Sequence, residues 1–305
     1  MSVRYKLAKP VIGKVAKGSL QRGLDHQKLF LKSIRAIQNR KTLPLDKLHK
    51  AIDFDERKVG ATNYYAVHSR KPAGHKLVLF LFGGGYCMPG GGRDFRYAQE
   101  MADETGAEVW LVWYPLLPDA TGYEIAKSVV DVFEVALASY SPGEIAFYGN
   151  SSGAALCLSA CVFMRKYRPE LPLPGKLVTQ SPPLRVPPTS KEREVMLKRA
   201  NQDMMIPARL VDIYLERDDI FDSGGFDELA SPIDQSWMGF PRLFVLYGGD
   251  EVFLAYLPAL LEKCKAEGVE LSVYVGKGGH SFSAVESLPE HKIGRKKVFE
   301  FLSRD

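Results

Sequence analysis

Cysteine is scarce in this sequence, with four residues in a chain of 305. The four, at positions 87, 157, 161 and 264, show no C-x-x-C spacing, which argues against a structural zinc site and a disulfide framework. Cys157 and Cys161 stand four residues apart on an expected buried helix, where free thiols pack as small apolar groups. A reducing, cytoplasmic setting is the default expectation.

Long apolar runs are also missing. No stretch approaches the roughly 18 consecutive apolar residues of a membrane-spanning helix. Lys6, Lys9, Lys14 and Lys17 interrupt the first twenty residues, so no signal-peptide core is expected there. Hydrophobic residues make up 46% and charged residues 25%, which supports an ample core and an ordinary hydrated surface. The length accommodates one large α/β domain or two smaller ones.

Acidic residues are scarce only near the N-terminus. Residues 1–50 hold 13 lysines and arginines against two aspartates, a net charge of +11, whereas the remainder carries −6. A basic arm of this kind can touch an anionic membrane surface weakly, although a solvated helical face is the simpler interpretation. No aromatic residues alternate with the charges and no nucleic-acid motif is present, so we expect no nucleic-acid partner.

Strands and helices are predicted to alternate through most of the chain. A near-alternating pattern over 51–59 and 62–69 predicts an antiparallel hairpin, and the wholly apolar run at 77–82 predicts a central strand buried on both faces. Further strands are expected at 109–113, 145–148, 177–180, 243–247 and 271–275, and helices at 95–105, 123–139, 154–164, 254–267 and 293–303. This order predicts an α/β fold with a mostly parallel central sheet flanked by helices.

One block breaks the alternation. Residues 182–237 hold no clear strand and are rich in charge, proline and methionine. Insertions of this kind often cap an active site. We therefore expect a helical arm at 1–50 that forms part of the cap, an α/β core at 51–183 and 239–305, and a cap insertion at 184–238.

A G-x-S-x-G motif lies between an expected strand and an expected helix: Gly149-Asn150-Ser151-Ser152-Gly153. In a nucleophile elbow, glycines on both sides permit a strained turn that lifts the serine hydroxyl clear of the sheet. The turn also aims the Ser152 N–H and the helix N-terminus at the point where an oxyanion forms. An ordinary Gly-Ser turn is the competing interpretation.

Two glycine runs follow the apolar strand at 77–82. Gly83, Gly84 and Gly85 come directly after it, and three more glycines stand at 90–92. Consecutive glycines let a backbone run close to a ligand with its N–H groups exposed, which suits the second half of an oxyanion hole. A dinucleotide loop is excluded because G-x-G-x-x-G would need glycine where Met88 stands, and no Walker lysine is present. A flexible glycine turn remains the alternative.

A base and an acid are expected after the last two strands. His280 lies in a glycine-rich loop late in the chain, where the histidine of a Ser…acid…His order falls. Asp250 and Glu251 follow the penultimate strand, and either carboxylate is placed to orient the imidazole and stabilise its charged form. The other five histidines, at 26, 49, 68, 75 and 291, are expected to be structural or solvated.

Together these motifs resemble the α/β-hydrolase fold and, more narrowly, the hormone-sensitive-lipase-like esterases, which include acetyl esterases. The likeness runs from about Leu77 to the C-terminus. Phe82-Gly83-Gly84-Gly85 stands where the family has His-Gly-Gly-Gly, and Tyr114-Pro115 stands where it has Tyr-Arg. Phe82 and Pro115 are therefore departures that mark a divergent member, and the substrate is not carried over.

The resemblance implies Ser151 as nucleophile and His280 as general base. It implies oxyanion N–H donors at Gly84, Gly85 and Ser152. The family acid stands three residues after a glycine and before an apolar pair, which fits Glu251. A spacing of thirty residues between acid and histidine is also common in the family and fits Asp250, so both remain candidates.

The sequence thus predicts a serine hydrolase that cleaves small carboxylic esters through an acyl-enzyme. The mechanism requires no metal and no organic cofactor. An amidase or peptidase with the same residues is one alternative. A ligand-binding protein on an inactive hydrolase scaffold is another.

Overall fold

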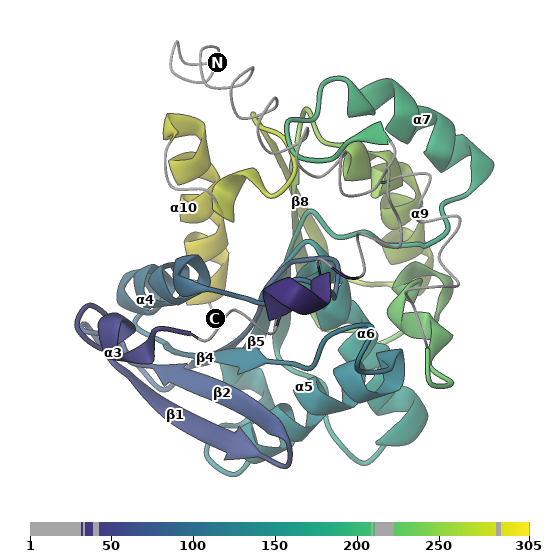
Figure 1. Cartoon of the computed structure of the whole chain (residues 1–305). Helices are drawn as coiled ribbons and strands as arrows, with labels where there is room; N and C mark the ends of the chain where they lie inside the picture. Colours follow the sequence, from purple (N-terminus) through teal and green to yellow (C-terminus); the bar gives the residue numbers. More distant parts are fainter. Residues whose placement is uncertain are drawn as a thin grey trace.

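The computed structural model describes residues 32, 34–38, 43–208, 210, 223–284 and 288–304 (Figure 1). Most of the expected arm at 1–50 and part of the expected cap therefore lie outside the described residues. Residues 34–38 are helical, and a short helix α3 spans Leu45–Leu48. None of the described helices combines the length and apolarity needed to cross a bilayer.

An eight-stranded sheet forms the centre of the molecule, with the strand order β1-β2-β4-β3-β5-β6-β7-β8. The pairs β1–β2 and β2–β4 are antiparallel, and all other neighbours are parallel. The strands are β1 Phe54–Val59, β2 Thr62–Val67, β3 Leu77–Leu81, β4 Glu108–Trp113, β5 Ile145–Asn150, β6 Lys176–Gln180, β7 Arg242–Gly248 and β8 Leu271–Gly276. The hairpin, the mostly parallel sheet and the α/β fold class expected from the sequence are confirmed.

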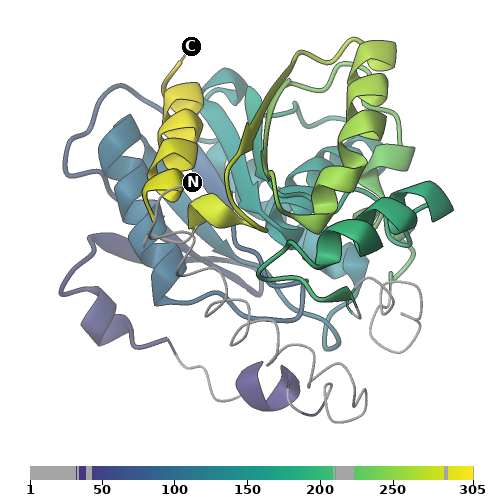
Figure 2. The same cartoon turned by 90° about the horizontal axis from the view of Figure 1, so that it is seen from above.

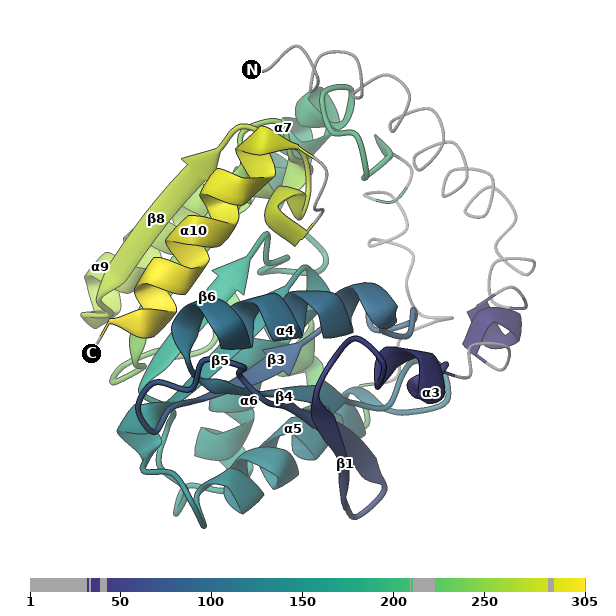
Figure 3. The same ribbon diagram turned by 90° about the vertical axis from the view of Figure 1, so that its left-hand side faces the viewer.

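Helices cover both faces of this sheet. Figure 3 shows α4 (Gly92–Thr105) and α10 (Pro289–Ser303) on one face, with α5 (Gly122–Ala136) and α6 (Ser152–Tyr167) on the other. Seen from above, α9 (Leu257–Glu267) and α10 lie on opposite sides of β8 (Figure 2). The sheet is therefore the middle of three layers.

Local sequence signals account for the helix boundaries. Thr121 caps α5 by accepting the N–H of Glu124, whose carboxylate accepts the N–H of Thr121 in return. Gly106 ends α4 in the left-handed conformation that glycine adopts without strain. The central strand β3 is buried at all five positions, as its unbroken apolar run predicts.

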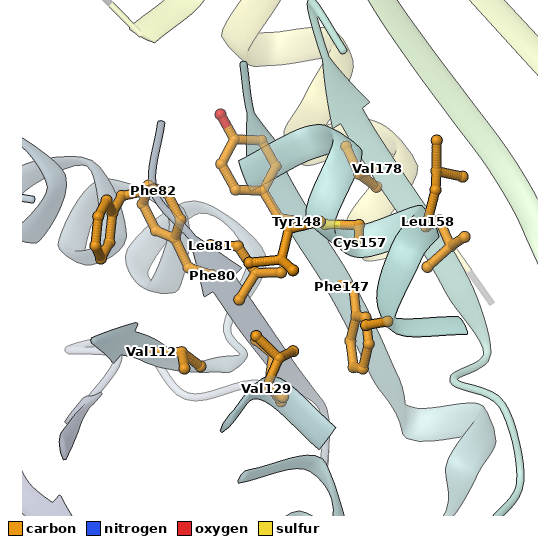
Figure 4. Close-up of a cluster of buried hydrophobic side chains, with 14 of the residues drawn as sticks. Phe80, Leu81, Phe82, Val112, Val129, Phe147, Tyr148, Cys157, Leu158 and Val178 are labelled. Atoms are coloured by element: carbon orange, nitrogen blue, oxygen red, sulfur yellow. The ribbon is translucent and has the colours of Figure 1, made fainter. Parts of the chain in front are cut away.

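Buried apolar side chains of β3, β5 and α6 form part of one continuous hydrophobic core. Figure 4 shows side chains from these elements together with Val129 of α5 and Val178 of β6. The rings of Phe80 and Tyr148 pack edge to face with centroids 4.9 Å apart. The four cysteines are buried and free, and burial raises the pKa of Cys87 to about 12. Cys157 and Cys161 pack as buried groups on α6, as expected. This packing fixes the carboxyl ends of β3 and β5, where the glycine loop and the elbow begin.

The insertion between β6 and β7 carries helices and no strand among its described residues. Helix α7 spans Ser190–Ala200, and two single-turn 3₁₀ helices span Asp227–Leu229 and Pro232–Asp234. Thr189 and Glu192 form a capping box at the start of α7. Helix α7 packs against the 3₁₀ helix at Val252–Tyr256, which leads into α9, and Figure 1 shows α7 above α9.

Candidate active site

Ser151 occupies the strained turn between β5 and α6. Its backbone has φ +55° and ψ −125°, a conformation that L-residues rarely adopt. A Cβ on Gly149 would lie 2.2 Å from the carbonyl oxygen of Gly153, and a Cβ on Gly153 would lie 2.1 Å from that of Leu81. Both glycines of the motif are therefore required by close backbone packing, and the ordinary-turn interpretation does not describe this geometry.

His280 lies against Ser151. Its Nε2 atom is 2.8 Å from the serine Oγ, a normal hydrogen-bond distance. The imidazole is 7% exposed, and the Phe253 ring packs edge to face against it at 5.1 Å. The structure thus brings together a serine hydroxyl and a buried imidazole that are 129 residues apart in the chain.

Glu251 lies behind the imidazole. Its Oε1 is 3.9 Å from Nδ1 of His280, and its side chain is fully buried. Neither of these two atoms has a hydrogen-bond partner among the described residues. The carboxylate oxygen and the ring nitrogen therefore face each other at slightly more than hydrogen-bond distance, and such contacts often tighten when substrate is bound.

The second oxygen of Glu251 is firmly held. Oε2 accepts the N–H of Gly248 at 2.6 Å and the hydroxyl of Ser181 at 2.7 Å. Burial raises the pKa of Glu251, while the interactions with His280, Ser181 and the Gly248 N–H each lower it. The carboxylate therefore has one oxygen fixed and one that faces the His280 ring.

Asp250, the other sequence candidate, lies differently. It is half-buried, and its backbone N–H donates to the carbonyl of Gly278 at 2.9 Å. The carboxylate that faces the His280 ring is that of Glu251. Through its main chain, Asp250 thus helps to join the loop that follows β7, which carries Glu251, to the loop that follows β8, which carries His280. We call these two loops the acid loop and the base loop.

The glycine loop runs against the elbow. A Cβ on Gly83 would lie 3.1 Å from the Cβ of Ser151, so the two segments touch. Gly84 and Gly85 have φ values of +141° and +62°, and the Tyr86 N–H that follows them donates to the Ser152 hydroxyl at 3.3 Å. The expected oxyanion donors at Gly84, Gly85 and Ser152 therefore belong to two segments that meet beside Ser151.

Phe82 is held by an aromatic stack at the start of this loop. Its ring lies parallel to that of Tyr114 with centroids 4.3 Å apart, and the Tyr114 hydroxyl donates to the Phe82 carbonyl at 2.6 Å. Both side chains are almost completely buried. The position that the family fills with histidine is here anchored by stacking and one buried hydrogen bond.

The described histidines other than His280 lie away from this site or within the core. His68 and His75 lie at the opposite, amino edge of the parallel strands, where they border a cavity of about 350 Å³ that also contacts Glu108 and Tyr140. His49 is partly exposed, whereas His291 is buried against Phe282. His26 lies outside the described residues. No cluster of three or more metal-ligating side chains occurs in the part of the chain that the structure covers.

Three residues near the site were not predicted from the sequence. Ser181 directly follows β6, and its place at a strand end was an available signal, because carboxyl ends of parallel strands meet at one edge. Arg199 and Asp203 lie in the insertion and contact the acid and base loops. Nothing in the sequence of the insertion distinguishes these two from its many other charged residues.

Comparison with protein families places the chain clearly. A family model described as the alpha/beta hydrolase fold matches residues 78–284. An esterase from Acinetobacter venetianus is 24% identical over 229 residues, which cover 74% of each chain. An acetyl-hydrolase from Streptomyces hygroscopicus is 26% identical over 184 residues, or 58% of each chain.

Solved structures agree with this placement. A crystal structure of an esterase from the bacterial hormone-sensitive lipase family superposes with a TM-score of 0.72 at 26% identity, covering 90% of this chain and 89% of that one. A mutant of the esterase E40 superposes with a TM-score of 0.78 over 99% of both chains at 24% identity. The resemblance to hormone-sensitive-lipase-like esterases is thereby confirmed.

Proposed function

This chain belongs to the α/β-hydrolase fold family, and on that premise we propose that it hydrolyses small carboxylic esters with Ser151, His280 and Glu251 as its catalytic residues. The homologues named esterase and acetyl-hydrolase support ester hydrolysis as the reaction. The single observation that carries the residue assignment is the 2.8 Å contact between Ser151 Oγ and His280 Nε2, with a buried carboxylate behind the ring.

The first half of the reaction forms an acyl-enzyme. The Ser151 hydroxyl attacks the ester carbonyl and passes its proton to Nε2 of His280. Glu251 stabilises the resulting imidazolium and holds the ring in the required orientation. The N–H groups of Gly84, Gly85 and Ser152 stabilise the oxyanion. When the tetrahedral intermediate collapses, the alcohol leaves with the proton from His280.

The second half releases the acid. His280, again neutral, takes a proton from a water molecule that attacks the acyl carbonyl. Collapse of this second intermediate breaks the bond to Ser151, and His280 returns the proton to the serine oxygen. The products are one carboxylic acid and one alcohol, and the side chains return to their starting state.

Glu251 is our choice for the acid because it is the candidate paired with His280. Its burial matters as much as its position, since a charge pair shielded from water interacts more strongly than one at the surface. Asp250 remains the residue to test beside it.

The insertion at 184–238 is proposed to be a cap over this site, and residues 1–50 to complete it. Together with the tight glycine loop, a cap favours short acyl chains. The basic arm is proposed to add weak contact with an anionic membrane surface. Deleting residues 1–22 tests this contact, because binding to anionic vesicles should be lost, and an intact chain that binds no vesicles would refute it.

The test of function is hydrolysis of p-nitrophenyl esters from acetate to laurate, with Ser151→Ala as control. We expect turnover on the short esters, declining with chain length, and none by the variant. Matched ester and amide substrates separate an esterase from an amidase or peptidase. A folded protein that hydrolyses neither would contradict catalysis and favour the ligand-binding alternative.

A further inference from the structure

Arg199 reaches from the insertion to the loop that carries Glu251. It stands near the end of α7, and its guanidinium donates to two carbonyl oxygens of that loop, those of Gly249 and Glu251. The second bond, from Nε, measures 2.7 Å. A charged fork with two backbone acceptors restricts both the position and the tilt of the loop.

Asp203 reaches the same loop from four residues further along. Its Oδ2 accepts the N–H of Val252 at 3.0 Å, and its Oδ1 accepts the N–H of His280 at 3.4 Å. Oδ1 also accepts the N–H groups of Met205 and Ile206, which fixes the carboxylate within its own segment. The side chain is 2% exposed, so these four N–H groups replace water around a buried carboxyl group.

The two side chains hold opposite ends of one peptide unit. The carbonyl of Glu251 and the N–H of Val252 belong to the same peptide bond, and Arg199 binds the first while Asp203 binds the second. This peptide bond directly follows the Cα from which the Glu251 side chain projects. Fixing its plane therefore limits where the Glu251 carboxylate can lie.

Asp203 also holds the base. The carboxylate that binds the Val252 N–H through one oxygen binds the His280 N–H through the other. The space around it is tight, because a Cβ on Gly279 would lie 3.3 Å from Oδ1. A single buried side chain thus joins the main chain of the acid loop to the main chain at His280.

We propose that Arg199 and Asp203 form a positioning clamp through which the insertion sets the distance between Glu251 and His280. The proposal rests on the proposed function, since it concerns the pairing of those two catalytic residues. Neither Arg199 nor Asp203 is assigned a contact with substrate. The clamp acts through the acid–base pair, and the placement of the insertion thereby becomes a condition for catalysis.

Asp203→Asn is the most direct test. Asparagine keeps the shape of aspartate, but its NH₂ group must face one of the backbone N–H donors, whichever way the amide turns. We expect kcat for p-nitrophenyl acetate to fall about 10- to 100-fold, as when groups that orient active-site ligands are removed, with KM changed less than about twofold. Asp234→Asn is the matched control, because Asp234 pairs with Arg185 within the insertion at 2.9 Å. It should leave kcat unchanged.

A double-mutant cycle separates positioning from general stabilisation. Once Glu251→Gln has removed the carboxylate, the clamp has no acid left to position, so adding Asp203→Asn should lower kcat further by less than about threefold. If the two losses multiply, or if Asp203→Asn alone leaves kcat unchanged, the clamp is refuted while the proposed function stands. If Glu251→Gln alone leaves kcat unchanged, the proposed acid and the clamp both fail.

Arg199→Met provides a second route if Asp203→Asn does not fold. It removes the fork and keeps a long apolar side chain, and Arg199→Lys should recover part of the lost kcat. The same cycle with Glu251→Gln applies. Loss of kcat that Arg199→Lys partly restores, and that disappears in the Glu251→Gln background, supports the clamp. An Arg199→Met variant with the parent kcat overturns it.

Discussion

Two histidine–glutamate pairs lie at opposite edges of the same sheet. At the amino edge, His75 Nδ1 is 3.3 Å from Glu144 Oε1, and the two side chains are 61% and 36% exposed. At the carboxyl edge, His280 Nδ1 is 3.9 Å from Glu251 Oε1, with 7% and 0% exposed. The closer pair is open to water, which weakens the interaction between its two groups, whereas the longer pair is shielded from water. The pair that we propose to be catalytic is therefore distinguished by its burial and not by a shorter distance.

Strained backbone conformations also distinguish the carboxyl edge of the sheet from the amino edge. Among the described residues, four that are not glycine have positive φ, and all four lie in loops that follow strands at the carboxyl edge. These residues are Tyr86, Ser151, Ser181 and Ser281. Tyr86 and Ser281 donate their N–H groups to the hydroxyls of Ser152 and Ser181. Strained conformations of this kind persist where surrounding structure holds them, commonly at functional sites.

Removing each histidine should give the largest difference in activity between the two pairs. His280→Ala should lower kcat roughly 10⁵- to 10⁶-fold, because the general base is lost. His75→Ala, at the exposed pair, should leave kcat within about twofold of the parent enzyme. Steady-state hydrolysis of p-nitrophenyl acetate measures both, and similar losses in the two variants would contradict the distinction.

Replacing each of the two neighbouring carboxylates should show which one acts as the acid. Glu251→Gln should lower kcat by about 10⁴-fold, as expected for a carboxylate that orients the imidazole and stabilises its charged form. Asp250→Asn should cost less than about tenfold, since Asp250 meets the base loop through its backbone. The same assay decides between them, and a larger loss in Asp250→Asn would reverse our assignment of the acid.

Glycine substitutions compare the packing of the two edges. Gly153→Ala places a methyl group against the carbonyl of Leu81 and should lower the free energy of unfolding by about 3 kcal/mol. A Cβ on Gly143, beside the start of β5, meets nothing within 4 Å, so Gly143→Ala should change stability by less than about 0.5 kcal/mol. Urea unfolding measures both, and equal midpoints for the two variants would argue against the tight elbow.

Ser181→Ala tests how the buried carboxylate is held. The Ser181 hydroxyl lowers the pKa of Glu251, so its removal should raise that pKa further. The loss of kcat on acidification should then begin at higher pH than in the parent enzyme, and kcat on the plateau should fall about tenfold. A pH profile of kcat measures this effect, and an unchanged or lowered acidic limb would contradict it.

The smallest expected effects are pH-dependent changes in Tm, and they have opposite signs for Glu251 at the carboxyl edge and Glu144 at the amino edge. Burial raises the pKa of Glu251, so its ionised form costs stability above that pKa and the cost fades as pH falls through it. Glu251→Gln should therefore raise Tm by about 2 °C at pH 8, with a smaller difference near pH 4.5.

Glu144 should show the reverse. The hydrogen bond from Ser141 lowers the pKa of Glu144, so the ionised carboxylate stabilises the fold at pH values above the usual glutamate pKa. This stabilisation is lost as pH falls through the lowered pKa. Glu144→Gln should lower Tm slightly at pH 8. Thermal melts at both pH values check the two signs, and a lower Tm for Glu251→Gln at pH 8 would contradict the cost of the buried carboxylate.

Much of the fold was predictable because its signals are local. The apolar run of β3, the hairpin pattern and the capping residues of α5 each depend on neighbours in sequence. The elbow was predictable for a similar reason, since Gly149 and Gly153 are required by contacts close to Ser151. The position of His280 after the last strand followed from chain order.

The remaining parts of the site depend on contacts between distant segments. The sequence left Asp250 and Glu251 open because adjacent residues differ only in which way the folded loop turns them. Asp203 could not be predicted from the sequence because its contacts are with N–H groups 49 and 77 residues away in the chain. The domain boundaries proposed from the sequence, including the arm at 1–50 and the cap at 184–238, remain predictions.

We propose that Ser151 is a reactive nucleophile at the carboxyl edge of the sheet. Labelling with a fluorophosphonate probe, followed by intact-mass measurement and peptide mapping, tests it most directly. We predict a single adduct on the peptide that contains Ser151, absent from Ser151→Ala and slowed strongly in His280→Ala. A folded protein that forms no adduct, or forms one at a different serine, would contradict the assignment of Ser151 as the nucleophile.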